Sequence, residues 1–252
     1  MFIKLYLANR FITKQENKML FLFKNPHVVV DCFTASESAM KFAPIVKGGH
    51  MIPDWWRNLR DGAEVVSTMK NCVGFTQLYA SAIALPVWTD IDVTVRPDGV
   101  DWKFYDTGTF AEVHNQAQRG TFAPQTQYQQ LKIVSPWFFQ EKTGVNFHVS
   151  GSPWNMANPF DYVVTPGVVN FKHQFSTNLN LLFHRQPQTF VKRLNLGDLG
   201  LLFVPMTEKK VKLKLHLVDD KEIRRFHHLA PVRRRSYFVN KAASGKCPFS
   251  EN

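Results

Sequence analysis

The feature that most constrains this chain is a succession of short segments rich in β-branched and aromatic residues, each bounded by turn residues. The clearest pair is 91–95 and 100–104, in which apolar and polar residues alternate on either side of the turn sequence Arg-Pro-Asp-Gly at 96–99. An Asp-Gly pair between alternating segments is typical of a β-hairpin, because glycine tolerates the positive φ of tight turns. The pattern therefore predicts a hairpin over 91–104.

Further segments of the same kind follow along the chain. They are 28–33, 131–134, 145–149, 162–164, 168–171, 178–183, 201–204 and 211–217. In the last of these, four apolar residues alternate with Lys212, Lys214 and His216, as expected for a sheet with one buried and one solvated face. Closely spaced strands with little helix predict a mainly β fold, namely a jelly-roll or β-sandwich-like domain with one or two short helices.

Two segments carry a helical pattern instead. Asp219–Leu229 begins with the spacing of a capping box and places apolar residues three and four positions apart. Pro231 is expected to end this helix, because proline lacks the backbone N–H that a helix interior requires. The second segment lies within 71–84, where apolar residues also recur at helical spacing. These segments account for the short helices expected beside the sheets.

The charge of the chain is concentrated at its two ends. The 252 residues have a net charge of +11, of which 1–24 contribute +4 and 207–252 contribute +7, while 25–206 are neutral. A basic segment attracts nucleic acid, phosphates or acidic protein surfaces. The alternative is a solvated basic surface that keeps a protein with 22 Phe soluble.

The charge distribution and the strand pattern together suggest three parts. Residues 1–18 are expected to be an N-terminal extension, 19–218 a β-rich domain, and 219–252 a basic helix with a C-terminal tail. The high aromatic content excludes disorder for most of the chain. No run approaches the roughly 20 apolar residues of a membrane-spanning helix, so no membrane is expected among the partners.

The C-terminal part supplies the residues most suited to an anionic partner. They are Arg224, Arg225, Arg233, Arg234 and Arg235. The last three precede a Ser-Tyr-Phe sequence, and cations interleaved with aromatic residues can bind phosphates and stack on bases. The same residues could equally bind an acidic neighbour in an assembly.

Four tryptophans are candidates for a ligand-binding or partner-binding surface. Trp55 and Trp56 follow a Pro-Asp turn, and Trp137 and Trp154 each stand in a Ser-Pro-Trp sequence after an expected strand. Exposed aromatic rings are typical of platforms that bind a partner, a sugar or a base. The alternative is that these side chains pack into the core or close one end of a sandwich.

No catalytic residue can be named from the motifs. The nine histidines show no metal-ligand spacing, and neither a nucleophile elbow nor a phosphate-binding glycine loop occurs, so no metal and no cofactor are expected. Asp90 and Asp92 lie on one side of a strand, where they could share a proton or bind a cation, or simply face solvent. The three cysteines lack a C-x-x-C pair and are expected to be free thiols in a reducing compartment.

Several sequence segments resemble a family of phage proteins. The segments are Ile-Pro-Asp-Trp-Trp at 52–56, 69–72, 85–90, 131–137, 165–171 and 200–207. In this order they resemble uncharacterised proteins of tailed phages of marine cyanobacteria and a related bacterial domain of unknown function, over roughly 19–225. The resemblance implies a phage protein, found in the virion or in the cytoplasm of the infected bacterial host, and it implies no activity.

Three functional hypotheses follow. The first is a phage virion or assembly component, without enzymatic activity, whose basic termini contact other phage structural proteins or DNA within an oligomer or larger assembly. The second is a host-acting enzyme or a small-ligand-binding β-sandwich with an aromatic-lined site. The third is a nucleic-acid-binding protein that uses Arg233, Arg234 and Arg235.

Overall fold

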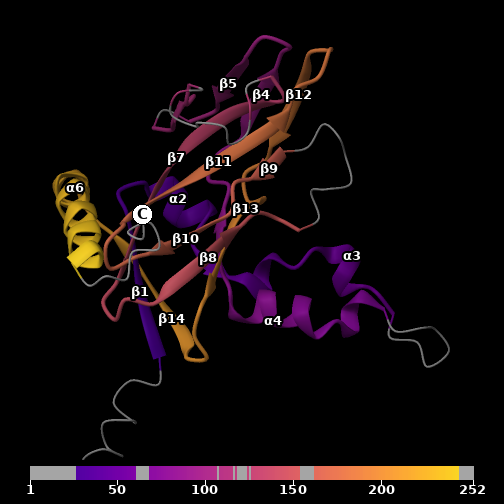
Figure 1. The fold of residues 1–252 in the computed structure, drawn as a ribbon. Helices are drawn as coiled ribbons and strands as arrows, with labels where there is room; N and C mark the ends of the chain where they lie inside the picture. The colour runs from indigo at the N-terminus through magenta and orange to yellow at the C-terminus, as the bar shows by residue number, and fades with distance from the viewer. Residues whose placement is uncertain are drawn as a thin grey trace, which may run out of the picture.

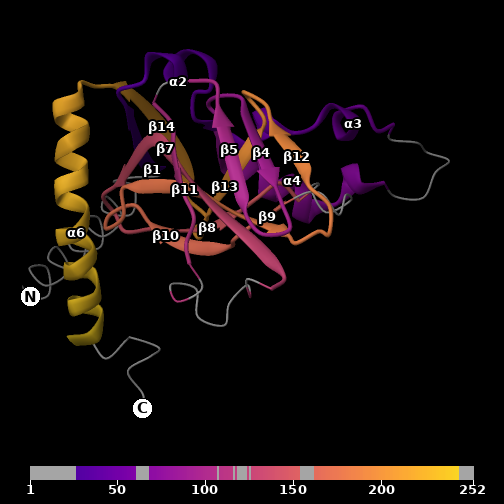
Figure 2. The same cartoon turned by 90° about the horizontal axis from the view of Figure 1, so that it is seen from above.

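Two layers of β-sheet form the body of the protein, with one long helix on one side and a group of short helices on the other (Figures 1 and 2). The computed structural model describes residues 27–60, 68–106, 108–115, 117, 124, 126–153 and 162–243. The expected N-terminal extension over 1–18 lies outside these residues. The predicted mainly β, sandwich-like fold is confirmed.

The first layer is a six-stranded sheet in the order β14-β1-β7-β11-β9, with β6 paired to β7. Its strands are β1 (His27–Thr34), β6 (Phe110–Glu112), β7 (Tyr128–Glu141), β9 (Tyr162–Val164), β11 (Ser176–His184) and β14 (Lys210–Leu217). All pairs are antiparallel except β1 with β14. The two longest strands, β7 and β11, form the centre of this sheet (Figure 1).

The second layer consists of a five-stranded and a three-stranded sheet. The five-stranded sheet has the order β10-β8-β13-β3-β2, and the three-stranded sheet the order β12-β4-β5. Their strands are β2 (Val46–Lys47), β3 (Ile83–Pro86), β4 (Ile91–Val95), β5 (Val100–Phe104), β8 (Asn146–Ser150), β10 (Gly167–Asn170), β12 (Phe190–Leu194) and β13 (Leu199–Pro205). Val87 donates a backbone hydrogen bond to Asp198, so the β3–β13 pairing continues towards β4 and β12.

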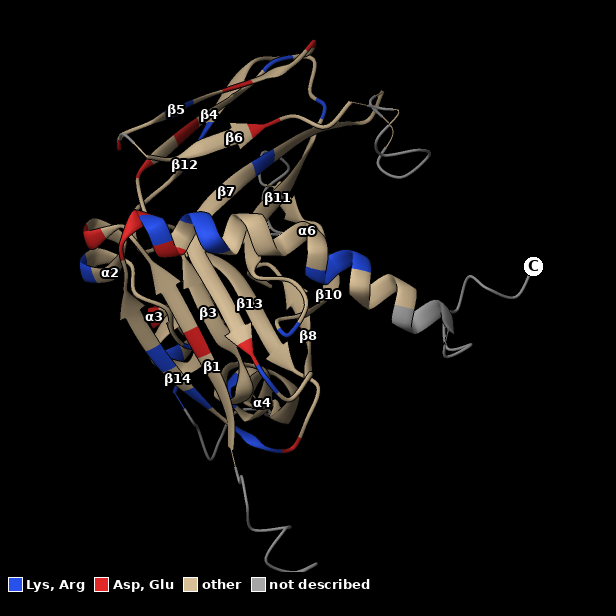
Figure 3. Cartoon of the chain, turned by 90° about the vertical axis from the view of Figure 1, so that its left-hand side faces the viewer, with Lys and Arg blue, Asp and Glu red and all other residues tan. Residues whose placement is uncertain are grey.

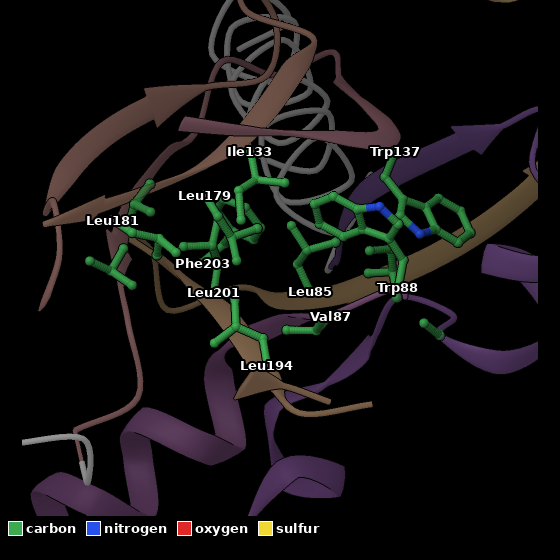
Figure 4. Packing of buried hydrophobic residues seen from close by; sticks show 14 of the residues in the cluster. Leu85, Val87, Trp88, Ile133, Trp137, Leu179, Leu181, Leu194, Leu201 and Phe203 are labelled. Carbon is green, nitrogen blue, oxygen red and sulfur yellow. The ribbon is translucent and has the colours of Figure 1, made fainter. Parts of the chain in front are cut away.

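The core lies between the layers and takes side chains from all three sheets. Figure 4 shows its centre, where residues of β7 and β11 face residues of β3 and β13. The labelled side chains are Leu85, Val87, Trp88, Ile133, Trp137, Leu179, Leu181, Leu194, Leu201 and Phe203. All of them are at most 4% exposed. Burial of this apolar surface is the main term that stabilises such a fold.

The predicted hairpin is confirmed, but its turn differs from the expectation. β4 and β5 pair over their full lengths, and Arg96 and Gly99 exchange backbone hydrogen bonds around Pro97 and Asp98. Gly99 does not have a positive φ, unlike Gly144 and Gly197. Proline at the first central position explains this, because it presets the negative φ of the turn that begins there.

The alternating strand at 211–217 is confirmed as β14, and it forms an edge of the six-stranded sheet. Its apolar face becomes more exposed along the strand, from 9% at Val211 to 37% at Leu215 and 51% at Leu217. Lys212 and Lys214 are exposed on the opposite face. Edge lysines discourage pairing with other strands, since adding a strand there would desolvate their charges.

Short helices gather at the side of the sandwich away from the long helix (Figure 2). They are α3 (Asp54–Arg57), α4 (Val73–Ser81), and the 3₁₀ turns η1 (Gly48–Met51) and η2 (Met69–Asn71), while α2 (Glu37–Phe42) follows β1. The helix expected within 71–84 is confirmed as α4. Tyr79 of α4 is fully buried and packs with Trp56 and Leu202 in a small second core.

The long helix α6 (Asp220–Ala243) corrects the prediction that Pro231 ends a helix after Leu229. Pro231 lies inside α6, which continues for 12 residues beyond it. A proline inside a helix removes one backbone hydrogen bond and costs about 3 kcal/mol. The residues after Pro231 that contact the sandwich offset this cost, so tertiary contacts override the local signal.

Pro231→Ala is expected to stabilise α6, because alanine restores the missing backbone hydrogen bond at an exposed position. The gain within the helix is expected to be up to about 3 kcal/mol. Hydrogen exchange of the amides around residue 231 would slow relative to the wild type. Lys221→Ala, also an exposed α6 position, is the control. Unchanged or faster exchange in Pro231→Ala would contradict a continuous helix.

Candidate interaction surface on helix α6

The first half of α6 is attached to the sandwich by aromatic packing. Phe226 is 5% exposed, and its ring centroid lies 4.9 Å from that of Phe33, 5.6 Å from Phe138 and 5.3 Å from Phe175. Ile223 and other apolar residues of α6 pack against the same cluster. These contacts lie on the outer face of the six-stranded sheet. They fix the direction of the helix and decide which of its side chains face solvent.

The second half of α6 keeps contact with the turn after β10. The guanidinium of Arg233 lies 4.5 Å from the ring centroid of Phe175 and donates a hydrogen bond to the carbonyl of Lys172 at 3.3 Å. Further on, the rings of Tyr237 and His173 lie 4.9 Å apart. Burial lowers the pKa of His173, and the charges of Lys172 and Arg233 lower it further. This part of the helix is therefore held by polar and aromatic contacts.

The five candidate arginines do not share one face of the helix. Arg233 faces the sandwich and is half-buried, whereas the other four are exposed. With 3.6 residues per turn, Arg224, Arg225 and Arg235 fall within an arc of about 100° on the side opposite Phe226. Arg234 lies between this arc and the sandwich. Figure 3 shows the basic residues as separate bands along α6, whose C-terminal end runs beyond the sheets.

The solvent-facing arc of α6 also contains apolar residues that the sequence reasoning missed. We define the outer face as Arg224, Arg225, His228, Val232, Arg235 and Val239. Val232 and Val239 are 64% and 57% exposed. The only acidic contact in this stretch that the structure describes is Glu222, 3.3 Å from Arg225 on the same helix. Such exposed pairs contribute little to stability, so the outer face keeps a positive charge.

The candidate tryptophans occupy different environments. Trp137 is fully buried between the layers, and Trp56 is 5% exposed in the second core. Both positions agree with the alternative interpretation, in which these tryptophan side chains pack into the core. Trp55 is 48% exposed on α3, at the opposite side of the molecule from α6. Trp154 lies outside the described residues. The structure therefore does not bring the three described candidates, Trp55, Trp56 and Trp137, together in one site.

Asp90 and Asp92 form an ion-pair cluster on the three-stranded sheet. Arg193 of β12 contacts Asp90 at 2.9 Å and Asp92 at 3.5 Å, and the Tyr105 hydroxyl donates to Asp92 at 2.7 Å. The backbone N–H of Leu196 donates to Asp90 at 2.8 Å and, together with Arg193, lowers the pKa of that carboxyl group. Both carboxylates are thus engaged by protein donors, and the cluster ties β12 to β4.

Among the residues that the structure describes, no three His, Cys, Asp or Glu side chains gather closely enough to hold a metal ion. Cys32 is a buried free thiol whose pKa is raised by burial, and Cys72 is an exposed one. In the described part of the chain, no helix combines the length and apolar character that crossing a bilayer requires.

Compared with models of known protein families, the sequence matches none, and no curated protein matches it either. The surfaces and side chains of the chain itself are therefore the basis for a functional proposal. The outer face of α6 combines exposed cations with exposed apolar residues.

Phe226→Ala is expected to release α6 from the sandwich, because it removes the side chain at the centre of the docking cluster. The loss is expected to be about 3–5 kcal/mol. Hydrogen exchange over 220–243 would rise, and fewer residues would be protected from proteolysis. Phe238→Ala is the control: Phe238 is 60% exposed, so the change is expected within about 0.5 kcal/mol. Equal effects of both variants would contradict the docking.

The attachment of the second half of α6 is expected to weaken in acid. Because the folded-state pKa of His173 is lowered, the unfolded state binds a proton first, and stability is lost as the pH falls below about 6.5. The protection factors for hydrogen exchange over 233–243, which are corrected for the intrinsic pH dependence of exchange, should therefore fall between about pH 7.5 and 5. His173→Phe keeps an aromatic ring beside Tyr237 but cannot titrate, and should reduce this fall in protection. An identical pH profile in both proteins would contradict the role of His173.

Proposed function

We propose that this protein is a non-enzymatic virion or assembly component of a tailed phage, and that it attaches to a neighbouring structural protein through the outer face of α6. The observation that carries the proposal is a helix packed against the sandwich on its inner side while its outer side presents both cations and apolar residues. Such a surface is suited to binding another protein.

The spacing along the outer face favours a helical partner. Arg225, His228, Val232, Arg235 and Val239 follow one another at intervals of three and four residues. These are the intervals of the a and d positions in a coiled coil, where one helix packs along another. Val232 and Val239 occupy equivalent positions two turns apart. They would supply the apolar contacts of the seam, and the arginines would supply its polar contacts.

The charge of the outer face determines which helix can bind. A second copy of α6 would bring two positively charged faces together, and like charges close to one another are unfavourable. A helix with acidic residues opposite Arg225 and Arg235 would instead form complementary ion pairs. Nucleic acid is less suitable, because phosphates satisfy the arginines but leave both valines in water. We therefore propose an acidic helix of another phage structural protein as the partner.

The phage context comes from the sequence resemblance, which implies a product of phage infection without implying an activity. A β-sandwich that carries one exposed docking helix is compatible with a subunit added to a larger assembly. The same proposal places the protein in the virion or in the cytoplasm of the infected host during assembly.

The proposal is tested by incorporation into particles. Quantitative mass spectrometry of gradient-purified parent phage is expected to find the protein at a fixed copy number. Combined replacement of Arg224, Arg225 and Arg235 by Glu is expected to reduce that copy number at least about tenfold, because it makes the outer face repel an acidic helix. Replacement of Lys209, Lys210 and Lys212 by Glu is the matched control, since it changes the net charge equally at other exposed positions.

A second pair of substitutions separates a protein partner from nucleic acid. Val232→Ser with Val239→Ser should leave stability within about 0.5 kcal/mol, because both residues are exposed. It should nevertheless lower incorporation if a helix packs on the outer face. Binding that ignores these changes but falls steeply with salt would indicate phosphate contacts and contradict the helical partner. Absence of the protein from purified particles would overturn the virion role.

A further inference from the structure

A cavity lies where the chain crosses from the first layer to the second. β9 ends at Val164 in the six-stranded sheet, and β10 begins at Gly167 in the five-stranded sheet (Figure 1). The connecting turn is held by a hydrogen bond from the Thr165 N–H to the carbonyl of Asn180 at 2.9 Å. Between this turn and strands β8, β11 and β13 lies a cavity of about 260 Å³. It is separate from the outer face of α6.

The cavity has an apolar wall and a polar wall. The apolar wall includes Val149, Leu201 and Phe203, which also belong to the main core. The polar wall consists of uncharged side chains that offer hydroxyl and amide groups: Thr165, Gln174, Thr177, Asn178 and Asn180. No charged side chain is among the described residues that line the cavity. A charged ligand would lose its hydration there without a counter-charge.

Two polar atoms of this wall are buried without a hydrogen-bond partner in the described structure. They are the hydroxyl oxygen of Thr177 and the side-chain oxygen of Asn178. Thr177 is only 4% exposed, and it alternates with the core residues Leu179 and Leu181 along β11, so its side chain faces between the layers. Buried polar groups in native proteins are nearly always hydrogen-bonded, and an unpaired one calls for an explanation. A hydroxyl group of a ligand in the cavity would supply the missing partner of Thr177, whereas Asn178 follows Thr177 in β11 and points to the opposite face of the sheet.

We propose that this cavity binds an uncharged polyhydroxylated molecule of the size of a single sugar ring. One of its hydroxyl groups would pair with Thr177, and its C–H face would lie on the apolar wall. A volume of about 260 Å³ holds about nine waters at roughly 30 Å³ each, which suits one ring rather than a longer saccharide. Such a site matches the usual composition of small-ligand pockets, which are apolar with a few placed polar groups.

The first test uses the wild-type chain and defined sugars. Binding is measured by saturation-transfer NMR with glucose, galactose and N-acetylglucosamine. Glucuronate serves as a charged analogue of the same ring. At least one neutral sugar is expected to bind, and glucuronate is expected to bind at least about tenfold more weakly. Failure of all three neutral sugars to bind, or equal binding of glucuronate, would overturn the proposal. Lactose and maltose distinguish two sources of the sugar ring. A site for a free sugar binds only the monosaccharides, whereas a site for the terminal unit of a glycan also binds a disaccharide.

Gly167→Leu blocks the cavity without disturbing the core. Gly167 pairs directly with Val149 across β10 and β8, so a side chain there would project to the same face, towards the cavity. A Cβ atom at Gly167 would meet nothing within 4 Å, and the glycine does not have a positive φ. The variant is expected to keep the melting temperature of the wild type and to lose sugar binding at least tenfold. Gly99→Leu, in an equally open position outside the cavity, is the matched control and should bind normally.

Thr177→Val separates a ligand-binding role of the hydroxyl from a structural one. Valine has nearly the shape of threonine but lacks the unpaired oxygen, so the melting temperature should be unchanged or higher. Sugar affinity should fall about tenfold, as expected for the loss of one well-placed hydrogen bond. A lower melting temperature with unchanged affinity would assign the hydroxyl to the fold and overturn its role in the cavity. Both variants retain the outer face of α6, so particle incorporation reports on the proposed function independently.

Discussion

The packing of strand β7 is the constraint on which the rest of the structure depends. Successive residues of a strand point to opposite faces, and β7 places aromatic side chains on both. Phe139 points between the layers, where it stacks with Phe171 at 4.9 Å, and Phe138 points outward to Phe226 of α6 at 5.6 Å. A single strand thus joins the two sheet layers and attaches the long helix. A shift of one residue in its register would exchange these two faces.

The attachment of α6 converts a basic sequence into a directional surface. An isolated helix with this sequence would expose its cations on every side. Because Phe226 and Arg233 are held against Phe175, the opposite side of the helix is fixed towards solvent. The proposed seam with an acidic helix depends on this orientation more than on the number of arginines. Arg233 itself serves the attachment, which explains why a run of three arginines divides between two roles.

The uncharged cavity and the charged outer face differ in their physical requirements. A charged surface in contact with water can attract a partner over about a Debye length, roughly 8–10 Å at ordinary ionic strength. A cavity bounded by Leu201 and Phe203 instead selects by shape and by hydrogen bonds, because desolvating a charge there is unfavourable. The two features lie in different parts of the molecule, so the two proposed ligands would not compete for one surface.

The periodicity of the sequence by itself determined the fold class, the hairpin over 91–104, the strand at 211–217 and the helix α4, because alternating and helical periodicities are local properties of the sequence. That β14 lies at a sheet edge was decided by the tertiary structure. The positions of Lys and Arg in the sequence also show that both ends of the chain are basic. The length of α6 was not predictable, since the local effect of Pro231 is overcome by contacts with residues some 60 positions earlier, such as Lys172. The burial of Trp137 and the exposure of Trp55 depend in the same way on which elements pack together. The cavity is the clearest case: Val149, Thr177 and Leu201 come from three strands, and only tertiary structure decides that they share one space.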